Sequence, residues 1–113
     1  MASTCNCTDL LGNRYEYSVC RFDLPWPDFG GVYIFVRWNR ALWEVLYVGK
    51  ADSFRNRLCA SHECWSKAEA LGATHVLARA VSDPARTTQE RRLIEAYNPP
   101  LNVQHRRSFL SGA

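Results

Sequence analysis

The sequence predicts an α/β fold in which a small three-stranded antiparallel β-sheet is flanked by helices. Three segments rich in β-branched and aromatic residues indicate the strands, and three segments with typical capping residues indicate the helices. The chain has 113 residues, of which 47% are hydrophobic and 22% are charged. This length and composition suit one globular domain with a single core and argue against extensive disorder.

Residues 1–28 are expected to form an N-terminal extension of the main domain. The first 14 or so show little periodicity and indicate a loose leader, whereas residues 15–22 alternate roughly with period two and can add an edge strand. Pro25 and Pro27 then interrupt regular structure. The main domain is expected to span residues 29–105.

Two of the predicted strands form a hairpin. Residues 32–37 and 43–48 are its strands, and residues 38–41 are a plausible turn. The period of two gives Tyr33 and Tyr47 each a definite side of the sheet. Whether both tyrosines lie on the same side depends on the strand register, which the sequence leaves open.

The helices are predicted from their boundaries. Asp52 or Ser53 can cap a helix over residues 54–61, and a shorter helix over residues 65–71 ends at Gly72. The third predicted strand follows, over residues 74–81.

A last helix is predicted from Asp83-Pro84 to about Tyr97. Glu90 lies at the edge of its apolar stripe, which places one carboxylate next to the core. An extended segment follows the helix, and residues 106–113 are expected to form a basic tail.

Charge and cysteine content narrow the class of protein. The net charge of +3 suits a polyanionic partner without establishing one. No apolar run approaches membrane-spanning length and the first residues do not resemble a signal sequence, so we expect a cytoplasmic protein without a membrane partner.

Five cysteines without a secretory signal are expected to be free thiols. The spacing of Cys59, His62 and Cys64 matches no standard zinc pattern.

Five motifs follow one another in the order typical of the GIY-YIG nuclease superfamily. Gly31-Val32-Tyr33 resembles the first motif and Tyr47-Val48-Gly49-Lys50-Ala51 the second; a helix arginine, Arg57, a metal-binding glutamate, Glu90, and a segment ending at Asn102 follow. Either tripeptide alone occurs by chance in many sheets, but the ordered series is specific. The chain is similar to the short free-standing bacterial members and to the GIY-YIG domain of excision-repair nucleases.

Two positions depart from the family pattern. The two tyrosines are further apart than is usual, which implies a longer hairpin loop. The family often has His or Tyr one helical turn after the arginine, where this chain has Ser61, with His62 one residue beyond.

The resemblance implies a metal-dependent endonuclease that hydrolyses phosphodiester bonds of DNA, with a link to DNA repair. It implies catalytic roles for Tyr33, Tyr47, Arg57 and Glu90, and it makes Glu90 the ligand of one Mg²⁺ or Mn²⁺. We expect Tyr33 to act as the general base, Tyr47 to position the reacting groups and Arg57 to clamp the phosphate. The expected substrate-binding residues are Gly49, Lys50, Arg57, His62 and Asn102.

Other functions fit the same residues. The chain can be a non-catalytic nucleic-acid-binding module that has kept the fold, or a structure-selective nuclease that acts on RNA. Family members usually carry a separate DNA-recognition domain. Targeting to DNA is therefore expected to come from a separate protein, from homo-oligomerisation or from the shape of the substrate.

Overall fold

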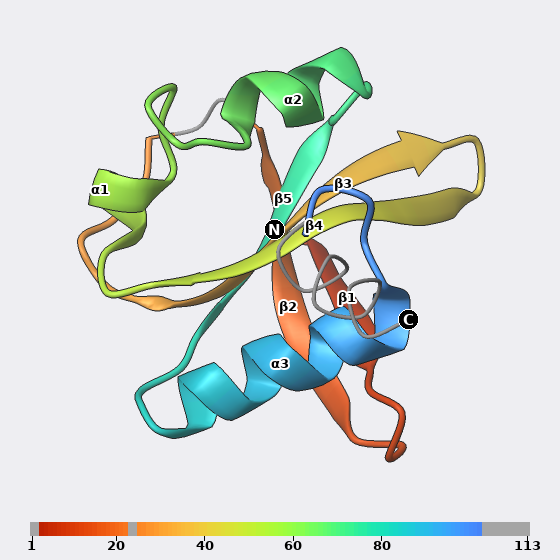
Figure 1. Ribbon diagram of the computed structural model, residues 1–113, viewed down its shortest axis with the longest axis vertical. Helices are drawn as coiled ribbons and strands as arrows, with labels where there is room; N and C mark the ends of the chain where they lie inside the picture. Colours follow the sequence, from red (N-terminus) through yellow and green to blue (C-terminus); the bar gives the residue numbers. More distant parts are fainter. Residues whose placement is uncertain (1–2, 23–24, 103–113) are drawn as a thin grey trace, which may run out of the picture.

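The computed structural model describes residues 3–22 and 25–102 (Figure 1). Its elements in chain order are β1 (Ser3–Thr8), β2 (Arg14–Arg21), β3 (Gly31–Asn39), β4 (Leu42–Ala51), α1 (Phe54–Arg57), α2 (Trp65–Ala70), β5 (His75–Ala80) and α3 (Ala85–Tyr97). The strands form one sheet in the order β1-β2-β5-β3-β4, and each neighbouring pair is antiparallel. The basic tail expected at residues 106–113 lies outside the described residues.

The prediction of a three-stranded sheet is wrong, because the sheet has five strands. The three predicted strands are present as β3, β4 and β5, but β1 and β2 extend the sheet beyond β5. The segment expected at an edge is β2, which lies between β1 and β5, and the expected loose leader supplies the edge strand β1. Cys7 is the one buried residue of β1, and the sequence of this strand has almost no hydrophobic alternation. The sequence therefore did not indicate a strand here.

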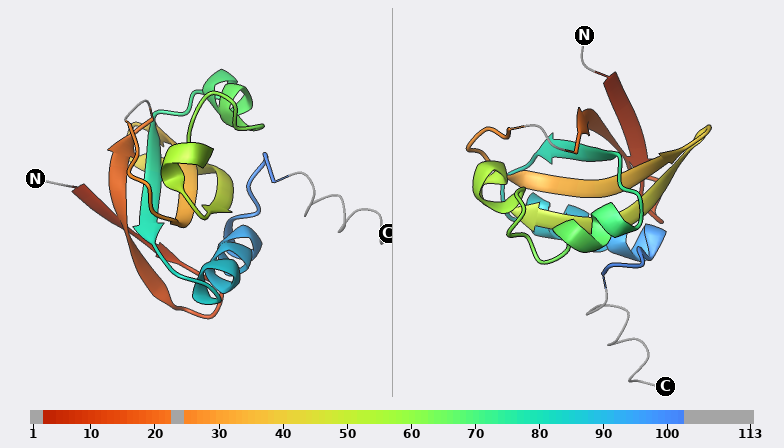
Figure 2. Two further views of the ribbon diagram at one scale, coloured as in Figure 1. Left: turned by 90° about the vertical axis from the view of Figure 1, so that its left-hand side faces the viewer. Right: turned by 90° about the horizontal axis from the view of Figure 1, so that it is seen from above.

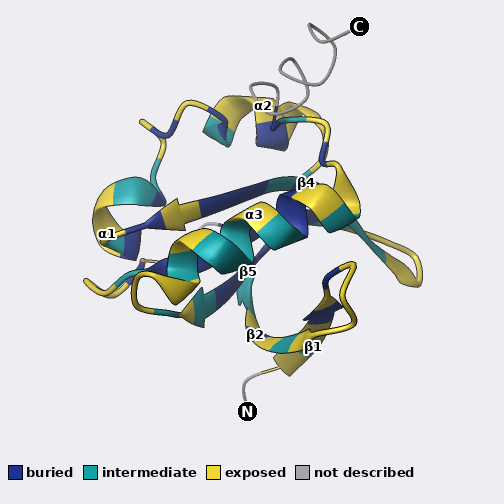
Figure 3. Ribbon diagram, turned by 60° about the horizontal axis from the view of Figure 1, so that its bottom comes forward, coloured by how far each residue is buried: buried dark blue, intermediate teal, exposed yellow. Residues whose placement is uncertain are grey.

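The turn between β1 and β2 is fixed by a single carboxylate. Asp9 accepts hydrogen bonds from the backbone N–H groups of Leu11 and Asn13 at 2.9 and 3.0 Å and from the Tyr15 hydroxyl at 3.1 Å. This local network orders the part of the chain expected to be loose. Figure 3 shows that this turn and the tip of the β3–β4 hairpin are exposed.

The first predicted helix is too long. Ser53 caps it as expected, since its side chain accepts a hydrogen bond from the N–H of Asn56, but α1 ends at Arg57. Leu58 leaves helical geometry with φ −89° and ψ 74° while its side chain is buried in the core. The chain then turns back through residues 59–64 before α2 begins.

The two faces of β3 lie in separate core clusters. Tyr33 and Phe35 pack with residues of α1 and α2 in the first cluster, whereas Val32 and Ile34 pack with residues of α3 in the second. Accordingly, α2 and α3 lie on opposite sides of the central strands in Figure 1, and Figure 2 shows the twisted sheet between them from two further directions.

Among the described residues, no helix has both the length and the apolar character needed to cross a membrane.

Candidate active site

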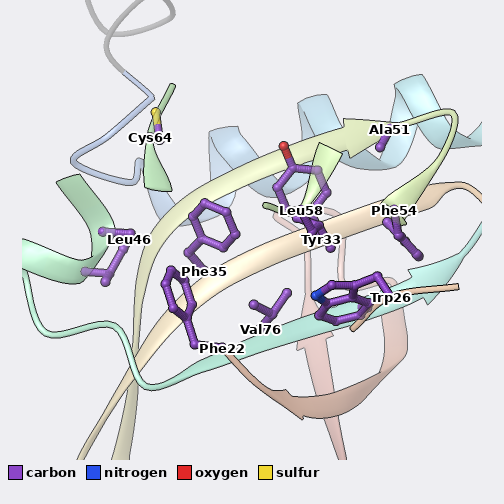
Figure 4. Close-up of a cluster of buried hydrophobic side chains, with 12 residues drawn as sticks. Phe22, Trp26, Tyr33, Phe35, Leu46, Ala51, Phe54, Leu58, Cys64 and Val76 are labelled. Carbon is purple, nitrogen blue, oxygen red and sulfur yellow. The ribbon is translucent and has the colours of Figure 1, made fainter. Parts of the chain in front are cut away.

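Strand pairing places the two motif tyrosines on the same face of the sheet. Tyr33 pairs with Gly49 and Phe35 pairs with Tyr47, so Tyr33 and Tyr47 are diagonal neighbours on the side covered by α1 and α2. Their ring centroids are 6.1 Å apart. Figure 4 shows the Tyr33 ring within the first cluster with its hydroxyl directed toward β4. The structure thus fixes the register that the sequence left open.

Gly49 makes room for the Tyr33 ring. A Cβ atom at this position would lie 2.5 Å from both Cζ and the hydroxyl oxygen of Tyr33, and 2.8 Å from the Tyr47 ring. Such distances are well inside van der Waals contact, so any side chain here would displace both tyrosines. The expected substrate contact of Gly49 stays a prediction, and the packing gives an independent reason for glycine at this position.

His62 joins the two tyrosines although it lies outside the predicted helix. Its Nε2 is 2.6 Å from the Tyr33 hydroxyl oxygen, and its Nδ1 accepts a hydrogen bond of 2.9 Å from the backbone N–H of Cys64. Because Nδ1 is an acceptor, the neutral ring carries its proton on Nε2 and donates it to Tyr33. Burial, assisted by the charge of Arg57, lowers the pKa of His62 to about 4, which keeps the ring neutral at pH 7.

Arg57 reaches the same site but is paired with a residue that the motifs did not indicate. Its two terminal nitrogens donate hydrogen bonds of 2.8 and 2.7 Å to the two carboxylate oxygens of Glu63. Hydrogen bonds from Arg57 lower the pKa of Glu63 to about 2, so the pair is fully charged at neutral pH. The Arg57–Glu63 pair depends on the turn after α1. Helical spacing in the sequence did not predict it.

Burial keeps both phenols in the neutral form. Burial raises the pKa of Tyr33 well above its ordinary value; Tyr47 adds to the rise and Arg57 opposes it. Burial also raises the pKa of Tyr47 to about 12, with further contributions from Cys64 and from the charges of Glu63 and Glu90. Removal of a proton from either phenol therefore requires additional positive charge in the site.

Glu90 lies on α3, the helix that packs against the other face of the sheet. It is half-buried, and its charge acts on the Tyr47 hydroxyl. Arg86, on the same helix, pairs with Asp52 at 2.7 Å.

The carboxylates near the site determine whether a divalent ion fits there. The described residues contain no group of three or more His, Cys, Asp or Glu side chains arranged to hold a metal. Mg²⁺ often binds through one or two carboxylates and completes its shell with water and phosphate oxygens. Glu90 fits that mode of binding, whereas a closed protein cage of ligands is not present in the described region.

Lys50 points away from the two tyrosines. It pairs with Val32 in the register, which places its side chain on the α3 side of the hairpin, and its Nζ donates a 2.9 Å hydrogen bond to Thr87. Lys50 and Arg57 nevertheless line the same surface hollow of about 340 Å³. A phosphate backbone that crosses this hollow would contact both cations.

Asn102 anchors the C-terminal segment to β4. Its side-chain oxygen accepts a 2.9 Å hydrogen bond from the N–H of Val48, and its side-chain nitrogen donates a 2.8 Å hydrogen bond to the C=O of Val48. The side chain is buried, and each of its two polar atoms makes one of these bonds. Asn102 thus anchors this segment to β4, and its expected phosphate contact stays a prediction.

The structure thus brings Tyr33, Tyr47, Arg57 and His62 together, and the charge of Glu90 on α3 acts on Tyr47. Comparisons of the chain with models of protein families, with curated proteins and with solved structures found no match. The likeness to GIY-YIG nucleases therefore rests on the five motifs and their arrangement.

Proposed function

We propose that the protein is a metal-dependent endonuclease that hydrolyses phosphodiester bonds of DNA. The observation that carries the proposal is the convergence of Tyr33, Tyr47 and Arg57 on one face of the sheet. Two phenol hydroxyls and a guanidinium supply a proton acceptor, a positioning group and an anion clamp within one small region.

Tyr33 is the proposed general base. The hydrogen bond from Nε2–H of His62 and the positive charge of Arg57 both favour its phenolate, while burial opposes it. Tyr47, which is half-buried and lies near two carboxylates, is the proposed positioning hydroxyl. Arg57 would hold two phosphate oxygens in a planar fork. A Mg²⁺ or Mn²⁺ ion bound at Glu90 would polarise the phosphate and stabilise the leaving oxygen.

A non-catalytic nucleic-acid-binding module is the second candidate function. Two observations favour it: the guanidinium of Arg57 is occupied by Glu63, and Tyr33 has an exposed fraction of 0%. A binding module needs only phosphate contacts at Arg57 and Lys50, and its phenols would never change protonation state.

A plasmid-nicking assay with Mg²⁺ or Mn²⁺ separates the two functions. We expect the wild type to nick DNA, and Glu90→Gln and Arg57→Ala each to lose on the order of 100-fold or more in rate. Glu95→Gln, an exposed change on the same helix as Glu90, is the matched control and should cut at the wild-type rate.

Three results would count against this proposal. Full cutting by both site variants would reject the assigned residues. DNA binding by the wild type without cutting would identify the binding module. Preferential cutting of an RNA hairpin over the corresponding DNA hairpin would identify RNA as the substrate.

A further inference from the structure

The guanidinium of Arg57 holds a carboxylate at the position proposed for a phosphate. Both oxygens of Glu63 are engaged, one by each terminal nitrogen, at 2.7 and 2.8 Å. This is the two-point geometry with which arginine also binds two oxygens of a phosphate group. One guanidinium edge cannot hold both anions in this way.

We propose that Glu63 is an internal competitor for the substrate phosphate and thereby sets the anion affinity of the site. The inference rests on the proposed function, in which Arg57 clamps the scissile phosphodiester. In the empty protein Glu63 keeps Arg57 beside Tyr33, and a nucleic-acid phosphate takes over the guanidinium when it binds.

Exposure makes this exchange feasible. The side chain of Glu63 is 61% exposed and that of Arg57 is 36% exposed, so the carboxylate can leave toward solvent without disturbing the core. An exposed ion pair contributes little net free energy, because water and salt compensate for most of the attraction. A polyanion, which also gains contacts with Lys50 in the adjoining hollow, can therefore replace Glu63.

The exchange would also change the surroundings of the two phenols. The negative charge of Glu63 acts on both Tyr33 and Tyr47, and it raises the pKa of each. Displacement of Glu63 by a substrate would thus couple phosphate binding to the charge around the proposed base.

Binding measurements without cleavage test the competition directly. The probe is a fluorescein-labelled DNA duplex, titrated without divalent metal into Glu90→Gln protein so that no cutting occurs. Adding Glu63→Gln should tighten binding about three- to tenfold, because it removes both a competitor and a repulsive charge. Inorganic phosphate is a second and smaller probe, and its binding is measured by its displacement of the labelled duplex.

The chain offers a matched control in a second exposed ion pair. Glu44 pairs with Arg37 at 2.7 Å and has a side-chain exposure of 41%, so Glu44→Gln removes the same charge away from the site. We expect Glu44→Gln to leave the affinity within about twofold of the parent protein. Equal tightening by Glu44→Gln and Glu63→Gln would show an effect of net charge alone and would overturn the proposal.

The gain in DNA affinity caused by Glu63→Gln must also depend on Arg57. In an Arg57→Ala background, Glu63→Gln should no longer tighten binding, since the anions compete for that guanidinium. Unchanged or weaker binding by Glu63→Gln would overturn the proposal and would leave Glu63 as a residue that only orients Arg57. Thermal unfolding checks the fold of each variant, and Glu63→Ala should reproduce the result of Glu63→Gln.

These outcomes are separate from those for the nuclease. Tightening through Arg57 in a protein that never nicks DNA would support the competitor and reject the catalytic function. Nicking by the wild type, with no tightening of DNA binding in Glu63→Gln, would support the catalytic function and reject the competitor.

Discussion

Gly49 and His62 show how single residues at the site are constrained by the core around them. Gly49 is required because the hydroxyl of Tyr33 occupies the space of its missing side chain. His62 is buried, and both of its ring nitrogens are hydrogen-bonded. Packing and hydrogen bonding in the core therefore account for both residues, independently of any catalytic role.

The buried His62 predicts a specific dependence of stability on pH. Its pKa of about 4 in the folded chain lies below its ordinary value of 6.5, so the unfolded chain binds the proton more readily. The stabilisation is complete above pH 6.5 and is lost as the pH falls from there toward 4. Between pH 7 and 5 the loss should be about 2 kcal/mol in the free energy of unfolding.

Urea unfolding at about pH 7 and pH 5 measures this loss, and both values lie above the range in which most carboxylates titrate. His62→Gln is the comparison, because it removes the titrating ring while retaining a polar side chain. The variant should show a much smaller difference between the two pH values. Equal differences in both proteins would mean that His62 is not the group responsible.

The motifs supplied most residues of the candidate site, whose roles stay predictions, and the way these residues meet depended on geometry. The spacing of two fixed the sides of Tyr33 and Tyr47, and only the strand register then showed that they face one another. Glu63 could not be predicted, because its contact with Arg57 arises where the helix stops early. Helical spacing would have placed these two side chains on different faces.

At the scale of elements, β4 carries the second motif and lies at the open edge of the sheet. Its outer backbone groups are met by the segment after α3 and not by another strand. Leu101 N–H donates a 3.0 Å hydrogen bond to Leu46 C=O, and Asn102 pairs with both backbone groups of Val48. This segment therefore satisfies outer backbone groups of β4, the edge strand that carries Tyr47.

Asn102→Ala should destabilise the protein by roughly 2–4 kcal/mol, because it leaves the buried N–H and C=O groups of Val48 without partners. Urea unfolding monitored by circular dichroism measures the change. Asn6→Ala, an exposed substitution on β1, should alter stability by less than about 0.5 kcal/mol. If Asn102→Ala kept full stability and lost only DNA affinity, phosphate binding would be its main role.

At the scale of the whole molecule, residues close to the N-terminus belong to the same sheet as the candidate site. Ser18 of β2 pairs with Ala78 of β5, and Tyr33 of β3 pairs with Ala78 from the other side. Pairings between segments so distant along the chain are set by the tertiary fold. The sequence therefore predicted β3, β4 and β5 from local composition and indicated β2 as an added strand at an edge, but it gave no sign of β1, which makes β2 an inner strand.

This continuity predicts that the protein unfolds as one cooperative unit. The two core clusters are joined through β3, whose alternate side chains lie in each of them. Leu58 of the first cluster and Leu93 of the second are both almost completely buried. Leu58→Ala and Leu93→Ala should each lower the free energy of unfolding by about 2–5 kcal/mol.

Two probes establish whether the transition is shared. Far-ultraviolet circular dichroism follows the whole sheet, and tryptophan fluorescence follows side chains such as Trp65, which packs against the first cluster, and Trp43, which packs against the second. We expect the two unfolding curves to coincide in the wild type and in both leucine variants, because loss of either cluster removes the support of β3. A variant in which fluorescence and circular dichroism changed at different urea concentrations would show that the two sides of the sheet unfold separately. In that case the candidate site and the α3 side that supplies Glu90 would not be held together by a common core.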